Sequence, residues 1–125
     1  METKQRPHKN LEVWKESIKL SKMIYKLCTG LPSDEKFGLI SQFKRASVSV
    51  ALNIAEGAAR ETPKEFYQFL KYSSGSLSEI DTLIEITFEL NLIQQNIKEE
   101  IFNQINKVSA LLSGLKKYVS LKCNH

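Results

Sequence analysis

The sequence is poor in the residue types on which most metal sites and many enzyme sites depend. It has two histidines, His8 and His125, both close to the chain ends, and two cysteines, Cys28 and Cys123, without CxxC spacing. A di-iron helical bundle needs Glu-x-x-His pairs inside its core, and a zinc site needs clustered cysteines and histidines. Neither pattern occurs. The sequence therefore predicts no metal site, no cofactor and no catalytic residue.

Signatures of phosphate binding, nucleophilic catalysis and membrane insertion are also missing. No G-x-x-x-x-G-K-[ST] or G-x-G-x-x-G motif occurs, and the serines have no core histidine to act as a base. No apolar run approaches the roughly 20 residues of a membrane span. The basic N-terminus is not followed by an uninterrupted apolar region, so it is not expected to be a signal peptide. We therefore expect a cytoplasmic, non-enzymatic protein that does not enter a membrane. Its cysteines are expected to be reduced rather than disulfide-bonded.

The feature that is present throughout is helical periodicity. Apolar residues recur at spacings of three and four, and no stretch alternates as a strand would. The pattern predicts four helices at about residues 11–29, 34–60, 63–90 and 97–121. We predict an all-α protein with a flexible basic arm over residues 1–9. Residues 10–122 are expected to form a single antiparallel, up-down-up-down four-helix bundle.

Capping residues precede all four of these helices, and Asn10 is expected to cap the first. The clearest boundary is Thr62-Pro63-Lys64-Glu65, because Thr62 can cap, Pro63 suits the first turn and Glu65 can complete a capping box. Ser33 is expected to cap the second helix, and Asn96 the fourth, with a glutamate three residues later.

The second predicted helix has too little polar surface for the edge of a single bundle. At about 100° per residue its polar side chains fall within an arc of roughly 80°. This polar seam comprises Gln42, Arg45, Ser49, Asn53, Glu56 and Arg60. A second apolar face on the back of the helix comprises Val48, Leu52, Ala55 and Ala59. Because a surface helix normally has one apolar stripe and one broad wet face, we expect another copy of the chain to cover this second face.

The polar seam has two interpretations. Its arginines, with Asn53 and Glu56, could line a ligand groove, or the seam could be a hydrogen-bonded strip where helices or subunits meet. Buried charges require partners, and Glu56 or Glu79 could pair with Arg45 and Arg60. We favour the hydrogen-bonded strip.

The run Ser73-Ser74-Gly75-Ser76 is unusual within a helix, because glycine there costs about 1 kcal/mol relative to alanine. It could act as a flexible hinge, or its small residues could allow close packing of another helix. We favour close packing.

Basic residues gather on the first helix and near the chain ends. The candidate nucleic-acid-binding residues are Lys15, Lys19, Lys22 and Lys26, with Lys116 and Lys117 near the other end of the chain. A phosphate backbone could lie along these lysines. Alternatively they form a solvated face that Glu12 and Glu16 partly neutralise. An acidic stripe of Asp81, Glu85 and Glu89 on the third helix could also meet the lysines of the first helix within the bundle.

Several of these residues together resemble a known family. The matching residues are Phe37-Gly38-Leu39, Gln42, Arg45-Ala46, Asn53-Ile54-Ala55-Glu56-Gly57 and Arg60, preceded by Leu11 and Val13-Trp14 and followed by Phe66, Phe69-Leu70, Gly75-Ser76 and Glu79. Over roughly residues 10–120 the chain resembles the bacterial four-helix-bundle proteins encoded by intervening sequences in 23S ribosomal RNA genes. Accessory proteins of diversity-generating retroelements are similar in fold. The chain departs from the family pattern at Ser74, where alanine is usual.

The resemblance implies a homopentameric ring without known catalysis. It further implies binding of RNA or DNA, and, by analogy with the retroelement proteins, contact with a reverse transcriptase. We therefore expect a homo-oligomer that binds nucleic acid through its basic surface. The alternative is a protein-binding scaffold, such as an accessory subunit for a reverse transcriptase, without a direct nucleic-acid role.

Overall fold

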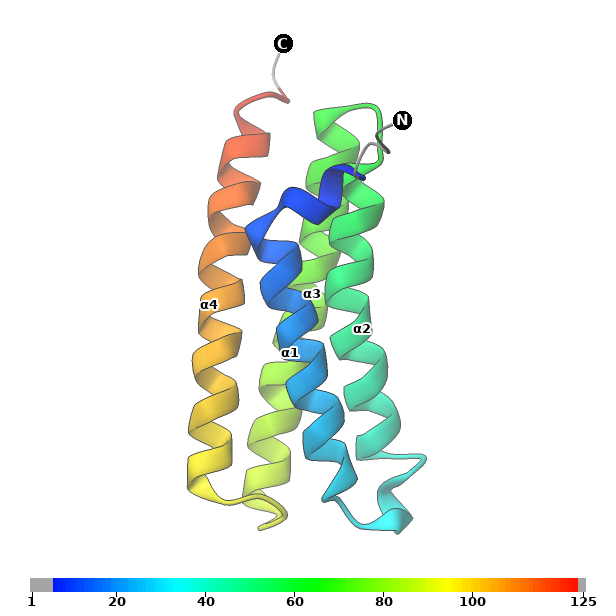
Figure 1. The fold of residues 1–125 in the computed structure, drawn as a ribbon, viewed down its shortest axis with the longest axis vertical. Coiled ribbons are helices and arrows are strands. Elements are labelled where there is room, and N and C mark those ends of the chain that lie inside the picture. The colour runs from blue at the N-terminus through cyan, green and yellow to red at the C-terminus, as the bar shows by residue number, and fades with distance from the viewer. Residues whose placement is uncertain (1–5, 124–125) are drawn as a thin grey trace, which may run out of the picture.

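Four long helices make up most of the chain. The computed structural model describes residues 6–123, with α1 (Glu12–Thr29), α2 (Leu39–Ala58), α3 (Pro63–Glu89) and α4 (Gln95–Ser120). Short 3-10 helices at Pro7–Asn10 and Ser33–Glu35 precede α1 and α2, and this part of the chain contains no strand. Consecutive helices run in opposite directions (Figure 1). The predicted all-α, antiparallel four-helix bundle is therefore confirmed.

The helices follow one another around the bundle in sequence order. α1 contacts α2 and α4, and α3 contacts the same two helices, so that α1 and α3 lie at diagonal corners. All four helices contribute to one core. Its largest fully buried apolar side chains are Phe43, Leu20, Ile24, Ile54, Leu70, Ile80, Ile84 and Leu112. Burial of each such side chain stabilises the fold by about 1.5–3 kcal/mol.

The start of α3 follows the prediction. The Thr62 hydroxyl oxygen accepts a hydrogen bond from the Glu65 N–H at 3.2 Å, and the hydroxyl donates to Glu65 Oε1 at 2.9 Å. Pro63 occupies the first turn, where the helix needs no N–H donor. The threonine therefore satisfies a backbone donor that would otherwise be unpaired.

α2 is shorter than predicted at both ends. It begins at Leu39 and ends at Ala58, and Ser33 starts a separate 3-10 helix instead of capping α2. The interruption lies at Gly38, whose ψ of −107° is far from the helical value. Glu35 replaces the predicted cap, because its Oε1 accepts a hydrogen bond from the Leu39 N–H at 3.3 Å.

Three further predictions about helix ends need correction. The N-cap of α1 is Leu11, so Asn10, which ends the preceding 3-10 helix, does not cap α1. α4 begins at Gln95, so Asn96 lies inside the helix and does not cap it. The predicted flexible arm includes the 3-10 helix Pro7–Asn10, which contacts α2 and places the His8 ring 5.0 Å from the Trp14 ring. The remainder of the arm, residues 1–5, lies outside the described residues.

α2 and α3 approach each other closely. A Cβ atom added to Gly57 would lie only 2.8 Å from Phe66 Cδ1 and 2.8 Å from Phe69 Cβ. About two turns further along the contact, the buried Ser73 hydroxyl donates to the Val50 carbonyl oxygen at 2.8 Å. Small side chains on both helices therefore permit this approach.

The prediction of close packing is wrong for Gly75 itself. This glycine is exposed, and a Cβ atom added to it would meet no atom within 4 Å. Its neighbours Ser73 and Ser76 face α2 instead, where both make hydrogen bonds. The helical rotation between positions 73 and 75 places the glycine on the outer side of α3.

The described residues also bear on the thiols and on the membrane. Both cysteines are free, as predicted, and Cys28 is buried whereas Cys123 is half-buried. Burial raises the pKa of the Cys28 thiol, although the nearby Lys44 opposes this shift. Across residues 6–123, no helix combines the length and the apolar character needed to cross a bilayer.

Candidate functional site

Four exposed lysines form a row along α1. This lysine row consists of Lys15, Lys19, Lys22 and Lys26. Their spacing keeps them on the side of the helix opposite the buried Val13, Leu20 and Ile24. At about 1.5 Å per residue the row extends roughly 16 Å. None of these lysines has an ion pair within 4.0 Å to a described carboxylate. Their charges are therefore available to a partner.

Glu16 does not neutralise the lysine row by pairing with it. Gln104 Nε2 of α4 donates to both the backbone oxygen and Oε1 of Glu16, each at 2.9 Å. Lys107 Nζ, also on α4, lies 3.5 Å from the same carboxylate oxygen. The Gln104 hydrogen bond, helped by the charges of Lys107 and Lys19, lowers the pKa of Glu16 although desolvation opposes this. Glu16 is thus turned toward α4.

Gln104 makes a contact between helices that the sequence analysis missed. It is buried, with 6% of its surface exposed, and it joins α4 to α1. The signal in the sequence is a glutamine directly before the core residue Ile105, within the apolar spacing of the fourth helix. A polar residue at a buried helical position must find a partner, but the sequence does not say which one.

The structure does not bring Lys116 and Lys117 to the lysine row. Lys116 is half-buried and lines a polar groove of about 210 Å³ between α3 and α4, together with Ser78 and Asp81. Lys117 is exposed on α4. Because α1 does not contact α3, Lys116 opens onto a different side of the bundle from the lysine row. The candidate nucleic-acid residues therefore divide into two groups.

The acidic stripe does not meet the first helix, a contact that the sequence had left open. The stripe lies on α3, diagonal to α1, so the two cannot contact each other. Glu85 instead pairs with Lys98 of α4 at 2.7 Å. Lys98 also lies 4.1 Å from the centre of the Phe88 ring, a cation–π distance. The lysine row consequently keeps its charge.

The middle of the polar seam on α2 is a hydrogen-bonded contact with α3. Asn53 Nδ2 donates to the Ser49 backbone oxygen and to Ser49 Oγ, both at 2.9 Å. The Ser76 hydroxyl of α3 then donates to Ser49 Oγ at 2.9 Å. This part of the seam agrees with the interpretation that we favoured.

The ends of the seam are exposed. Arg60 forms an ion pair with Glu56 at 3.4 Å, which is one of the pairings named in the sequence analysis. The Arg60 guanidinium also lies 4.7 Å from the Phe69 ring centre. Gln42, Arg45 and Glu79 are exposed, and no ion pair joins Arg45 to Glu79 in the described part of the chain. The seam is therefore a helix contact at its centre and open surface at its ends.

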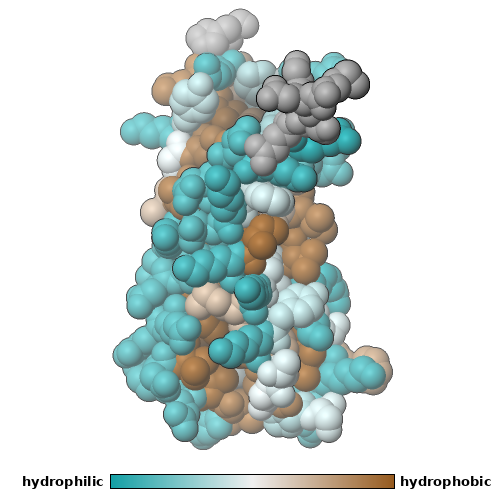
Figure 2. All heavy atoms as spheres, in the orientation of Figure 1, coloured by the Kyte–Doolittle hydropathy of each residue, from teal (hydrophilic) through white to brown (hydrophobic). Residues whose placement is uncertain are grey.

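The second apolar face of α2 is uncovered within one chain. Leu52 is 61% exposed, Ala59 is exposed, and Val48 and Ala55 are half-buried. Ile18 of the neighbouring α1 is also 45% exposed. Figure 2 shows hydrophobic surface along α2, next to hydrophilic surface over much of α1 and α4. The two kinds of surface that the sequence predicted thus lie side by side.

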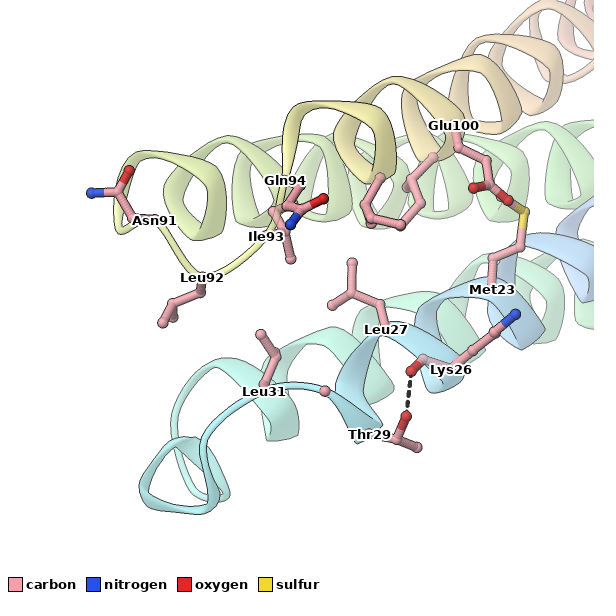
Figure 3. A pocket seen from close by; sticks show the side chains of 13 residues that line it. Met23, Lys26, Leu27, Thr29, Leu31, Asn91, Leu92, Ile93, Gln94 and Glu100 are labelled. Carbon is pink, nitrogen blue, oxygen red and sulfur yellow. Dashed lines mark hydrogen bonds between the residues drawn. The ribbon is translucent and has the colours of Figure 1, made fainter.

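A pocket opens at one end of the bundle, and we call it the end pocket. It has a volume of about 580 Å³ and lies between the end of α1 and the α3–α4 connection (Figure 3). Apolar side chains form most of its wall: Met23, Leu27, Leu31, Leu92, Ile93, Ile97 and Ile101. Its polar lining includes Lys26, Gln94 and Glu100. No group of three or more potential metal-ligating side chains occurs among residues 6–123.

These features define a four-helix bundle whose candidate binding sites lie on its surface. The described residues offer an exposed lysine row, an uncovered apolar face and an apolar pocket, arranged around a core of ordinary composition. Such surfaces are suited to binding and assembly.

The chain matches the family described as 23S rRNA-intervening sequence protein over residues 9–114. It therefore belongs to this family, as the resemblance in the sequence predicted. A search among curated proteins finds no match.

Proposed function

We propose that this protein is a cytoplasmic, non-catalytic homo-oligomer, a pentamer, that binds RNA or DNA through the lysine row. The observation that carries the nucleic-acid part is the row itself, with four exposed lysines over roughly 16 Å and no described carboxylate paired with them. Lysines in such a row contact phosphates and release counterions. Binding should then have little sequence preference and a steep dependence on salt.

The diagonal placement of α1 and α3 supports this proposal. The acidic stripe could have neutralised the lysines had it lain beside them, but it lies on the helix that does not touch α1. Glu16, the acidic residue nearest the middle of the row, is held by Gln104 and Lys107 on α4. The row therefore keeps a positive potential that attracts a polyanion.

The self-association part rests on the apolar face of α2. Leu52 would lose its exposed apolar surface if another copy covered it, and each Å² removed from water contributes about 25 cal/mol. The small neighbours Val48, Ala55 and Ala59 would permit close approach of a second helix. The copy number of five comes from the resemblance to the family.

A salt titration of RNA binding tests the nucleic-acid part. The variant replaces Lys15, Lys19 and Lys22 by Gln, and leaves Lys26 intact because it lines the end pocket. The matched control replaces the exposed Lys64, Lys71 and Lys122 by Gln, which removes the same charge elsewhere. We expect weaker binding to a generic single-stranded RNA. The slope of log affinity against log salt should flatten by about 2, since each lost phosphate contact contributes roughly 0.7.

The control decides the outcome. If the row variant and the control weaken binding equally, the effect is one of net charge and the row is not the site.

The second candidate function is a protein-binding scaffold, for example for a reverse transcriptase, which the uncovered apolar face on α2 favours. Retention of a defined protein partner after nuclease treatment, with no RNA binding by the pure protein, would support that function instead.

A further inference from the structure

One aromatic side chain projects almost fully from the surface. Phe37, in the connection between α1 and α2, is 90% exposed, the highest value among the large exposed apolar residues described. Among residues 6–123, the ring of Phe37 has one cation–π neighbour, the adjacent Lys36, whose Nζ lies 5.6 Å from the ring centre. Exposed aromatic side chains in binding proteins commonly serve as anchors that enter a pocket of the partner.

The connection that carries Phe37 is fixed on both sides. Before it, Leu31 is buried with 8% of its surface exposed, and Ser33–Glu35 forms a 3-10 helix. After it, the Glu35 carboxylate accepts the hydrogen bond from the Leu39 N–H that begins α2. Phe37 therefore projects from a loop whose conformation is fixed by the residues on both sides of it.

The end pocket offers a matching cavity at the same end of the bundle. Leu27, Leu31 and Ile93 point into the space between the end of α1 and the α3–α4 connection (Figure 3). Its volume of about 580 Å³ exceeds the space that one phenyl ring occupies. Since Phe37 is almost fully exposed, it does not enter the pocket of its own chain.

The charges beside the ring and around the pocket are complementary. Phe37 follows Asp34, Glu35 and Lys36, and the end pocket carries Lys26 and Glu100 in its lining. None of these five charged residues forms an ion pair with a described residue. The Glu35 carboxylate already accepts the hydrogen bond from the Leu39 N–H. When Phe37 enters the pocket, Asp34 and Lys36 therefore approach a lining that carries one group of each sign.

We propose that Phe37 of one copy inserts into the end pocket of the next copy. This proposal rests on the self-association proposed above and assigns it a contact. The α1–α2 and α3–α4 connections lie at the same end of the long axis (Figure 1). A contact between two different surfaces at the same level can repeat by rotation about an axis parallel to the helices without a shift along that axis, and it forms a ring when the rotation closes.

The first test compares self-association of the wild type with that of Phe37→Ala by sedimentation velocity over a range of concentrations. Tyr72→Ala is the matched control, since Tyr72 is an aromatic residue on α3 with 50% of its surface exposed. Truncation of a central aromatic anchor should weaken self-association at least tenfold. The control should weaken it less than threefold.

The second test changes the pocket. Ile93→Glu places a charge in the apolar wall, and Glu100→Lys changes only the exposed lining, so that it remains informative if the first variant does not fold. Ile93→Glu should weaken self-association as much as Phe37→Ala does, and Glu100→Lys should weaken it severalfold. An equimolar mixture of Phe37→Ala and Ile93→Glu keeps one intact Phe37 and one intact pocket. It should therefore form a complex of one copy of each that grows no further.

Three results would overturn the proposal. The first is a Phe37→Ala variant that assembles like the wild type, which would leave the pocket to another partner. The second is a mixture that forms no complex while each variant is folded by circular dichroism. The third is a wild type that remains monomeric at all concentrations, which would also end the proposed self-association. The first two results would refute the contact between Phe37 and the end pocket and leave the proposed self-association and the lysine row unaffected. Failure of this contact is therefore distinguishable from failure of the proposed function.

Discussion

Replacement of Gly57 by alanine tests the close approach of α2 and α3. The added Cβ would lie 2.8 Å from Phe66 Cδ1, 2.8 Å from Phe69 Cβ and 3.2 Å from the Phe66 backbone oxygen. Carbon atoms in favourable contact are about 3.5–4.0 Å apart, so the deficit is about 1 Å. The ring of Phe66 can rotate, but its backbone oxygen and Phe69 Cβ cannot move without α3.

The expected magnitude follows from two opposing effects. Overpacking of this kind costs about 1–3 kcal/mol, whereas replacing glycine by alanine in a helix gains up to about 1 kcal/mol. We therefore expect Gly57→Ala to lower the free energy of unfolding by about 1–2 kcal/mol. For a chain of this size the midpoint of thermal unfolding should fall by roughly 3–10 °C.

Two glycines of the same chain provide matched controls. Gly75 and Gly114 lie in α3 and α4, and a Cβ atom at either position would meet no atom within 4 Å. Gly75→Ala and Gly114→Ala should therefore raise the free energy of unfolding by about 0.5–1 kcal/mol. The measurement is thermal and urea denaturation by circular dichroism at several protein concentrations, because association also shifts the midpoint. Equal midpoints for all three variants would refute the close approach of α2 and α3.

Three further predictions concern the surface, the thiols and a carboxylate. Leu52→Glu should yield smaller particles by light scattering with helicity retained, because a charge would then occupy the uncovered face of α2; unchanged particle size would argue against this face as an interface. Cys123 should react with a thiol reagent in the native protein, whereas Cys28 should react only on unfolding, since burial raises the pKa of the Cys28 thiol; rapid labelling of both would contradict this. The pKa of Glu16 is lowered by folding, so its stabilising contribution is complete above its unfolded pKa of about 4.5 and is lost as the pH falls through the lower folded value. Wild type and Glu16→Gln should thus differ less in free energy of unfolding near pH 3 than at pH 6, and a difference independent of pH would contradict the assigned role of Gln104.

The helices were predictable because each follows from local patterns. The apolar spacing gave four helices, and the box at Thr62 gave the start of α3 because capping depends on neighbouring residues alone. The beginning of α2 was not predictable in this way. Ser33 has the side chain of a cap, but the turn at Gly38 delays the helix and leaves the capping to Glu35.

The surfaces were only partly predictable, because they depend on which helices are neighbours. The lysine row follows from the spacing on one helix, and its exposure agrees with that spacing. By contrast, Lys116 could not be placed from the sequence, since its position beside Asp81 depends on the pairing of α3 with α4. The end pocket depends on two chain segments that are distant in sequence, residues 23–31 and 91–101, so that no local pattern signals it.

The diagonal placement of α1 and α3 has an electrostatic consequence for the whole molecule. The basic helix and the acidic helix stand at opposite corners, so their charges set up an electric dipole across the narrow dimension of the bundle. In the electric field of a polyanion, such a molecule rotates until the side that carries α1 faces the polyanion. At physiological salt this torque acts only within about 8 Å of the surface, so orientation is selected in the last step of the approach.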